Sequence, residues 1–557
     1  MPDPNQANGT KRPIEWSNVN WREVNRQVRN LRQRIFRATQ AGEYNKVRSL
    51  QKLMLRSTSN TLLSVRRVTQ VNAGKNTAGV DKLTVTTPAA RSQLVEYLSP
   101  CQPWKAKPAR RVYIPKASGK LRPLGIPTII DRCLQAKVKN ALEPSCEAEF
   151  EGSSYGFRPG RGCHDAIAKI YSLARPNKLK KWVVDADITG CFDNIDHQFL
   201  LDTIGPVPGR ELIKQWLKAG YVENGVFHDT EAGTPQGGVI SPLLANIALH
   251  GMEEALGVKH KSTGEIRGPR AVVRYADDFV VFCESKEDAE QAEITLKEWL
   301  SDRGLSLSPE KTRIVHLTQG FDFLGFNIRH YENQTSKSGF TLLIKPSKKS
   351  VKAIREKLHD EWTHSVGSNA SAVIKKLNPI VRGWANYFRI GVASRTFNSL
   401  DQWMFQKERR YASRSHPTKP MYWKKEKYWG RLNLARKDNW VFGDKRSGKF
   451  LLKFSWFNIK RHVLIKSTHS PDNPKLREYW QARNMTLSKD LVPSLQKVAT
   501  NQKHICQNCG ESLYNGEELE LHHVIPVSKG GKDTYSNLKL VHLYCHQQIT
   551  AEMSKGT

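Results

Sequence analysis

The sequence of 557 residues lacks several features that would point to particular classes of protein. It has no apolar run of about 18 residues, the length that a transmembrane helix needs. It opens on Met1-Pro-Asp-Pro-Asn-Gln6 and not on the apolar stretch of a secretory signal, so we expect a soluble intracellular protein. Its nine cysteines are too few and too scattered for a disulfide framework. Internal repeats are also absent, and the length favours three or more domains.

Acidic residues are few relative to basic ones. Lys and Arg number 88 against 53 Asp and Glu, which gives a formal net charge of +35 spread along the chain. Because Lys and Arg neutralise phosphates and release counterions, nucleic acid is the expected partner. A ribosomal or histone-like protein would share this charge but rarely the length. We therefore expect a cytoplasmic protein that associates with RNA or the nucleoid and not with a membrane.

Two adjacent carboxylates, Asp277 and Asp278, lie between strand-like runs at 271–275 and 279–283. These runs predict a β-hairpin whose turn projects both carboxylates. A third strand-like run, from Lys181, ends in Asp187. If the strands are neighbours, three carboxylates converge and attract Mg²⁺, and two such ions about 3.5–4 Å apart can activate a 3′ hydroxyl and stabilise a leaving pyrophosphate. Taken alone, an Asp-Asp pair also fits a solvated turn.

Basic segments surround this acidic cluster. Residues 110–127 predict a hairpin that presents Lys116, Lys120 and Arg122 to a triphosphate, or simply a basic surface. The stretch from Asn20 to about Ser57 and the stretch from Ser285 to Gly304 both predict helices. A third region, about 350–445, is predicted to be helical and basic, and its tryptophans suit either core packing or stacking on unpaired bases.

Taken in order, these blocks resemble the reverse transcriptases encoded by group II introns, the maturase family of mobile ribozymes. Tyr113–Pro127 resembles the fingers motif, Tyr155–Gly160 the next block and Asp185–Asp196 the first palm motif. Gly233–Pro242 and Tyr275-Ala-Asp-Asp278 follow in the family's order, and Arg382–Phe388 resembles the maturase thumb.

The resemblance assigns roles to single residues. It implies that Asp187, Asp277 and Asp278 are catalytic and hold two Mg²⁺ ions. It also implies that Phe192 is the steric gate that rejects an incoming nucleotide carrying a 2′ hydroxyl. The other residues that it places around that nucleotide are Lys116, Arg122, Gln236 and Lys311.

The end of the chain resembles an HNH nuclease. Cys506-Gln-Asn-Cys509 is followed by Glu520–Pro526, Gly530-Gly531, Asn537-Leu538 and His542–His546. Cys506, Cys509, His542 and Cys545 have the two-plus-two spacing of a structural Zn²⁺ site, although family members often carry Cys at the position of His542. A lone Cys-x-x-Cys would more often be a zinc knuckle. The resemblance implies that His523 activates water, His522 and His546 hold one divalent metal, and Asn537 braces the loop.

The expected fold class is α+β: a right-hand polymerase with fingers, palm and helical thumb, plus a small zinc-stabilised ββα-metal HNH domain. The expected domains are an N-terminal extension with a basic helix, fingers, palm, thumb (maturase domain), a basic DNA-binding region and the HNH endonuclease, at 1–85, 86–180, 181–345, 346–445, 446–500 and 501–557.

The leading hypothesis is a multifunctional intron-encoded protein. It would bind its group II intron RNA, assist splicing, nick target DNA and copy the intron from the nicked end with dNTPs. Two alternatives remain: an RNA-binding splicing cofactor with an inactive polymerase, and a reverse transcriptase of a non-intron system. Intact Asp187, Asp277 and Asp278 argue against the first, and the thumb and nuclease motifs argue against the second.

Overall fold

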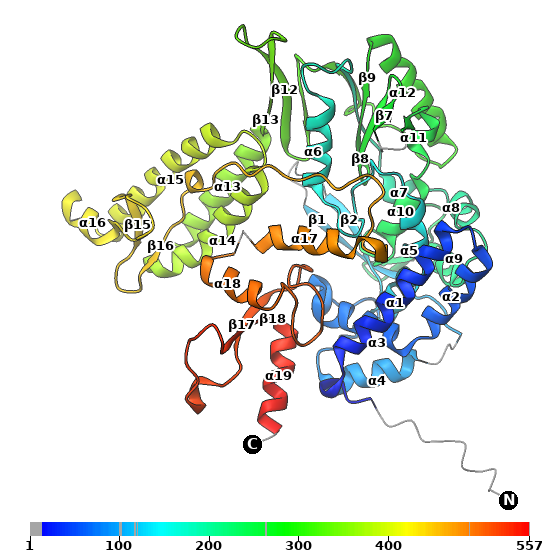
Figure 1. Ribbon diagram of the computed structural model, residues 1–557, viewed down its shortest axis with the longest axis horizontal. Helices are drawn as coiled ribbons and strands as arrows, with labels where there is room; N and C mark the ends of the chain where they lie inside the picture. The colour runs from blue at the N-terminus through cyan, green and yellow to red at the C-terminus, as the bar shows by residue number, and fades with distance from the viewer. Residues whose placement is uncertain are drawn as a thin grey trace, which may run out of the picture.

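The computed structural model describes residues 14–99, 103–115, 119, 121–261, 265–488 and 491–555. In Figure 1 the N-terminal helices lie at the lower right, the sheet that contains β8 and β9 lies above them, and α13–α16 lie on the left. The C-terminal elements β17, β18 and α19 lie at the bottom of the same view. Within the described residues, no helix is both long enough and apolar enough to cross a membrane.

The N-terminal segment forms a small group of helices that packs on α5. The sequence predicts one helical stretch from Asn20 to about Ser57, and the structure interrupts it at Gly42, whose φ of 70° suits glycine. The Asn20 side chain caps the first helix by accepting a hydrogen bond of 3.1 Å from the Glu23 amide. The helices are α1 (Trp21–Gln40), α2 (Tyr44–Arg56), α3 (Thr58–Arg66), α4 (Pro88–Leu98) and α5 (Ile129–Glu149).

The predicted basic hairpin is confirmed and belongs to a four-stranded sheet of order β2-β1-β4-β5. Strands β1 and β2 pair antiparallel and bring Arg122 opposite Ile114, while β4 runs parallel to β1. Lys116 and Lys120, which follow β1 and precede β2 in the sequence, lie outside the described residues. The strands are β1 (Ala109–Pro115), β2 (Leu121–Ile126), β4 (Tyr221–Glu223) and β5 (Val226–His228).

A second sheet, which we call the central sheet, has the order β10-β3-β9-β8 with antiparallel neighbours. Alternate residues of β9 enter two different cores: Phe279 and Val281 pack on one side, Val280 and Phe282 on the other. Burial on both faces explains why these strands read as continuous apolar runs. The strands are β3 (Trp182–Asp187), β8 (Ala271–Tyr275), β9 (Asp278–Cys283) and β10 (Arg313–His316).

Helices cover the central sheet, and α6 and α12 contact its strands directly. The helix predicted between Ser285 and Gly304 is confirmed as α12 (Lys286–Ser301), and the Ser285 side chain caps its N-terminus. The other elements around the sheet are α6 (Cys163–Leu173), α7 (Cys191–Asn194), α8 (His197–Ile204), α9 (Arg210–Lys218), α10 (Ser241–Ala248), α11 (Met252–Ala255), β6 (Lys259–His260) and β7 (Ile266–Arg267).

A three-stranded sheet of β11 (Phe321–Phe323), β12 (Phe326–Glu332) and β13 (Phe340–Pro346) leads into a helical region. The prediction that this region stays helical to about residue 445 is wrong after Tyr428. There the chain forms a small sheet in which Trp429 pairs with Phe442, and both side chains are buried against the helices. The elements are α13 (Lys348–His364), α14 (Ala370–Phe388), α15 (Ser394–Ser415), α16 (Met421–Tyr428), β14 (Trp429–Gly430), β15 (Val441–Asp444) and β16 (Lys449–Phe450).

The C-terminal segment folds against the N-terminal helices. Residues of both segments share one hydrophobic core, in which Trp21 and Val24 of α1 join Val498, Leu513 and Leu540. The C-terminal elements are α17 (Arg477–Leu487), α18 (Pro493–Asn501), β17 (Leu519–His523), β18 (Leu538–His542) and α19 (Leu543–Lys555).

Candidate active sites

The ends of β3 and β9 bring the three predicted aspartates together. Asp187, the last residue of β3, pairs in register with Asp278, the first residue of β9. Asp277 lies in the turn between β8 and β9, where Ala276 takes a positive φ of 59°. A positive φ at this position is typical of two-residue hairpin turns. The turn therefore presents Asp277 and Asp278 side by side, next to Asp187 on the neighbouring strand.

Burial and mutual repulsion raise the pKa values of two of these carboxylates. For Asp278, burial is the largest cause, followed by the charges of Asp277 and Asp187, and its pKa rises to about 7. Burial also raises the pKa of Asp277, while the positive charges of Arg122 and Lys311 act in the opposite direction. Lys311 Nζ lies 2.6 Å from Asp187 Oδ2 and neutralises part of the charge. Such crowding favours the binding of cations by the cluster.

Phe192 and Gln236 lie together beside this cluster. The Thr234 amide donates a hydrogen bond of 2.5 Å to the Phe192 carbonyl, and Gln236 Nε2 donates one of 3.0 Å to Asp193 Oδ2. The Phe192 ring packs edge-on against Phe157, with 6.2 Å between ring centroids. Phe192 and Gln236 line a cavity of about 130 Å³ together with residues of β1, β2 and β4. A half-buried ring at the rim of a small cavity is suited to sensing the size of a ligand.

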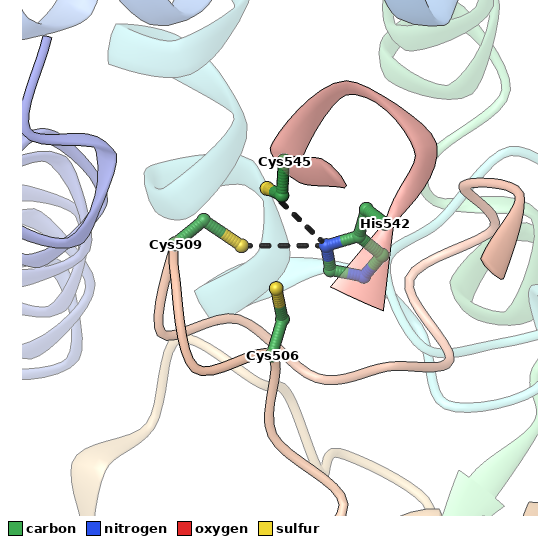
Figure 2. A group of neighbouring side chains, drawn as sticks. All are labelled: Cys506, Cys509, His542 and Cys545. Carbon is green, nitrogen blue, oxygen red and sulfur yellow. Dashed lines mark hydrogen bonds between the residues drawn. The ribbon is translucent and has the colours of Figure 1, made fainter. Parts of the chain in front are cut away.

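The predicted zinc ligands form a second cluster, which Figure 2 shows. Cys506, Cys509, His542 and Cys545 are all buried, and their ligand atoms lie within 4.8 Å of one another. His542 Nδ1 is 3.3 Å from Cys509 Sγ and 4.0 Å from Cys545 Sγ. Three thiols and one imidazole at these distances fit a tetrahedral Zn²⁺ site.

Three histidines lie on β17 and α19, close to the zinc cluster in sequence. The rings of His522 and His546 pack edge to face, with 5.1 Å between their centroids. Burial, followed by the neighbouring charges of His546 and His523, lowers the pKa of His522 and favours the neutral ring that can ligate a metal. His523 Nε2 is 2.5 Å from Asp533 Oδ1, and His546 Nδ1 is 2.5 Å from Glu520 Oε2.

Asn537 holds the loop that connects β17 to β18. Its Oδ1 accepts a hydrogen bond of 2.7 Å from the Ile525 amide, and its Nδ2 donates bonds of 3.0 Å to the carbonyls of Ile525 and Lys532. Gly531 must be glycine, because a Cβ there would lie 2.7 Å from the Ile525 carbonyl carbon. These contacts give Asn537 the bracing geometry expected of it.

Comparisons with known proteins agree with this geometry. Family models match residues 114–328 (reverse transcriptase, RNA-dependent DNA polymerase), 16–98 (N-terminal domain of reverse transcriptase), 351–429 (group II intron, maturase-specific domain) and 506–552 (HNH endonuclease). Protein YkfC of Escherichia coli is 35% identical over 311 residues, which cover 48% of this chain and 80% of YkfC. The chain belongs to the group II intron-encoded reverse transcriptase–maturase family and carries an HNH domain.

Proteins from other organisms are also similar to this chain. The group II intron-encoded protein LtrA of Lactococcus lactis is 32% identical over 385 residues, covering 54% of this chain and 63% of LtrA. The putative COX1/OXI3 intron 2 protein of Saccharomyces cerevisiae is 24% identical over 519 residues, covering 78% of this chain and 57% of that protein. The chain thus spans about three fifths of these two relatives. The family match gives the reverse transcriptase region the right-hand polymerase fold.

Reverse transcriptases and HNH nucleases use divalent metals, and both candidate sites offer suitable donors. Asp187, Asp277 and Asp278 supply the oxygen ligands that Mg²⁺ prefers. Within the part of the chain that the structure describes, only the Cys506 cluster gathers three or more His, Cys, Asp or Glu ligand atoms within 4.8 Å.

Sequence reasoning missed the residues that hold the turn between β8 and β9. Gly156 packs so closely that a Cβ there would lie 2.9 Å from the Tyr275 carbonyl carbon and 3.0 Å from Ala276 Cα. The buried Arg274 donates through Nη1 to Asn246 Oδ1 at 3.0 Å, and Asn246 Nδ2 donates to the Gly156 carbonyl at 2.9 Å. The only signal in the sequence was the position of Gly156 inside a recognised block.

Sequence reasoning also missed Arg66, which is almost fully buried beneath the zinc cluster. Its Nη2 lies 3.4 Å from Cys545 Sγ and 3.2 Å from Glu517 Oε2. Because Arg66 belongs to α3 and is distant from Cys545 in sequence, no local pattern could reveal this contact. A guanidinium at this distance stabilises negative charge on the sulfur ligands.

Proposed function

We propose that the protein is a multifunctional group II intron-encoded protein. It is an RNA-directed DNA polymerase, a maturase that assists splicing of its intron RNA, and an HNH DNA endonuclease. Together these activities serve target-primed reverse transcription and intron mobility. The observation that carries the polymerase proposal is the register of Asp187 with Asp278, beside Asp277 in the adjoining turn.

In the polymerase, the chain's own residues position and select the nucleotide. Asp187, Asp277 and Asp278 would hold two Mg²⁺ ions, which would activate the primer hydroxyl and stabilise the leaving pyrophosphate. Lys116 and Arg122 bind the triphosphate. The positive charge of Arg122 also lowers the pKa of Asp277, against the effect of burial. Lys311 balances charge at Asp187.

Phe192 and Gln236, which line the small cavity, select the sugar and contact the template. The Phe192 ring occupies the space that a 2′ hydroxyl would need, so dNTPs are accepted and ribonucleotides are rejected. Gln236, whose backbone carbonyl accepts a hydrogen bond of 2.7 Å from the Gly125 amide, lies beside the templating pair. These backbone contacts join the two residues to the β1–β2 hairpin and fix their positions.

The nuclease assignment rests on the three histidines of β17 and α19. His523 removes a proton from the attacking water, and Asp533 orients the His523 ring. His522 and His546 would hold one divalent metal, which would stabilise charge on the DNA phosphate. Asn537 keeps the β17–β18 loop in place. Zn²⁺ bound by Cys506, Cys509, His542 and Cys545 has a structural role.

We assign the domains as the sequence predicts them. The extension contains α1–α3, and the β1–β2 hairpin belongs to the fingers. The central sheet is the palm, and α13–α16 form most of the thumb. The segment between the thumb and the nuclease is a basic DNA-binding region. The ranges are 1–85, 86–180, 181–345, 346–445, 446–500 and 501–557.

The proposed partners are the intron RNA, the target DNA and dNTPs, and the proposed location is the cytoplasm. A splicing cofactor with an inactive polymerase is disfavoured, because Asp187, Asp277 and Asp278 are intact and lie together. A reverse transcriptase of a non-intron system is disfavoured by the maturase-specific match at residues 351–429.

Nicking of a target DNA separates the nuclease from the polymerase. We expect His523→Ala to lower the nicking rate at least a hundredfold, because it removes the imidazole that takes the proton from water, and to leave cDNA synthesis from a supplied primer intact. The control is His364→Ala, which removes an exposed imidazole on α13. Nicking by His523→Ala at the wild-type rate would show that the C-terminal segment is a binding module.

A further inference from the structure

A large hollow lies at the outer end of the thumb, away from both candidate active sites. It has a volume of about 1210 Å³ and is lined by the end of α13, by α15 and α16, and by the turn after β15. Figure 1 shows α15, α16 and β15 at the left edge of the molecule, while β8 and β9 lie on the opposite side. None of the residues expected to act in polymerisation or DNA cleavage lines this hollow.

One wall of the hollow is a row of cations on α15. Lys407, Arg410 and Arg414 are three and four residues apart, so they lie on the same face of the helix. Among the described residues, no carboxylate lies within ion-pair distance of any of the three. Cations lined up on one face without acidic partners attract an anion.

The opposite wall adds more positive charge and little negative charge. Lys427, Lys445 and Arg446 line it, with Glu426 and Asp444 as the only acidic residues. Asp444 is already engaged, because its carboxylate accepts hydrogen bonds from the Arg446 amide at 3.2 Å and the Ser447 hydroxyl at 2.7 Å. The hollow as a whole therefore carries a net positive charge.

Two imidazoles hold ammonium groups at the rim of the hollow. Lys407 Nζ lies 2.7 Å from His359 Nδ1, and Lys427 Nζ lies 2.9 Å from His416 Nε2. Burial, followed by the charges of Arg410 and Arg414, lowers the pKa of Lys407. A neutral imidazole accepts a hydrogen bond from each ammonium and fixes its position, which prepares a fixed array of donors.

An aromatic surface lies next to these donors. The half-buried Trp423 packs against His416, with 4.8 Å between ring centroids. Lys427 and Lys419 lie over the Trp423 ring at 5.0 and 5.6 Å from its centroid. An aromatic ring in contact with cations offers both kinds of group that bind an unpaired base and its phosphate.

We propose that this hollow binds one or two unpaired nucleotides of a single-stranded nucleic acid, with the α15 cations on the phosphates and a base against Trp423. The volume exceeds the roughly 300–1,000 Å³ typical of sites for small ligands. Duplexes are recognised across their grooves and backbones, so a hollow with an aromatic wall is better suited to a base that is not paired. The inference rests on the proposed binding of nucleic acid and specifies where the thumb takes part in it.

Photo-crosslinking of the full chain tests the site. The RNA probe is a fluorescein-labelled octauridylate containing 4-thiouridine, and the DNA probe is the corresponding thymidine octamer with 4-thiothymidine. Crosslinks are mapped by mass spectrometry to residues 416–428. The site variant is Arg410→Gln/Arg414→Gln, and the control is Arg395→Gln/Arg409→Gln, which removes the same charge from the same helix outside the hollow.

We expect the crosslinking yield at residues 416–428 to fall at least tenfold in the site variant. The yield of the control should stay within twofold of that of the unsubstituted protein. The slope of log K against log salt should become shallower by about 1.4, or about 0.7 for each lost phosphate contact. Loss with octauridylate alone identifies RNA as the source, and loss with both probes identifies any single strand. Wild-type crosslinking by the site variant with both probes overturns the proposal. If the unsubstituted protein binds neither probe, the proposed nucleic-acid binding itself fails.

Discussion

At the scale of single residues, the carboxylate cluster destabilises the fold that carries it. The pKa of Asp278 rises from an ordinary 3.8 to about 7, chiefly through burial. The folded chain therefore holds a proton that the unfolded chain releases between about pH 4 and pH 7. Stability of the metal-free protein must fall as the pH rises through that interval, and the whole cost is present above about pH 7.

We therefore expect Asp278→Asn to melt at a higher temperature than the unsubstituted protein in EDTA at pH 8, by about 3 °C or more. Most of the difference should disappear at pH 5, where the folded carboxyl is already protonated. Differential scanning calorimetry at the two pH values measures it, with Asp360→Asn on the exposed face of α13 as the control. Excess Mg²⁺ should reduce or reverse the difference, because it binds the folded state through the native carboxylate. An equal or lower melting temperature at pH 8 contradicts this description of the cluster.

Gly156 shows how one missing side chain positions the catalytic turn. Replacing it with Ala would place a Cβ 2.9 Å from the Tyr275 carbonyl carbon, so the turn that carries Asp277 must shift. Because small displacements of catalytic groups are costly, we expect Gly156→Ala to slow cDNA synthesis at least tenfold.

Gly162→Ala is the matched control for that prediction, since nothing lies within 4 Å of the position where its Cβ would be. It should retain the wild-type rate in the same primer-extension assay. Calorimetry of both variants separates a local shift of the turn from loss of the fold. Equal rates for the two variants would remove Gly156 from the positioning of the turn.

At the scale of elements, the sequence predicted the parts whose local pattern decides their structure. The strands β3, β8 and β9 follow from continuous apolar runs, and α12 follows from the cap at Ser285. The small sheet after Tyr428 was not predictable, because its strands are only two to four residues long and depend on burial of Trp429 and Phe442 against the helices. Contacts between distant segments, such as Arg66 with Cys545, leave no local signal.

The cluster of Cys506, Cys509, His542 and Cys545 is attached to the N-terminal helices. Arg22 Nη2 donates to the Gln507 carbonyl at 2.6 Å, and Asn25 Nδ2 donates to the Cys509 carbonyl at 3.1 Å. Arg29 pairs with Glu511, and the hydrophobic cores of the two segments are continuous. The nuclease and the N-terminal helices should therefore respond together when the cluster is disturbed.

Removal of Zn²⁺ with a chelator should raise amide hydrogen exchange both in residues 504–546 and in the first two turns of α1. The reason is that binding free energy at a structural zinc site is folding free energy, and α1 packs directly on the loop between Cys506 and Cys509. Mass spectrometry measures amide hydrogen exchange before and after chelation. The helices α13 and α14 are internal controls, in which exchange should not change. Unchanged protection of α1 would show that its fold is independent of the cluster.

At the scale of the whole molecule, family models match the N-terminal helices, the central sheet, the thumb helices and the C-terminal segment. The match to the maturase-specific domain covers residues 351–429, which connect the polymerase half to the C-terminal segment. Figure 1 shows the C-terminal elements beside the N-terminal helices, so the two ends of the described chain meet. The N-terminal helices and the C-terminal segment thus share one hydrophobic core.

Primer extension on an RNA template tests the central claim most directly. The unsubstituted protein is compared with Asp277→Ala/Asp278→Ala, which removes two of the three carboxylates, and with Asp360→Ala as a charge control. We predict that the double variant loses cDNA synthesis by about three orders of magnitude or more, because the metal-binding oxygens are gone. The control should extend the primer normally, and binding of RNA by the double variant should persist. Near-normal extension by Asp277→Ala/Asp278→Ala would contradict the account.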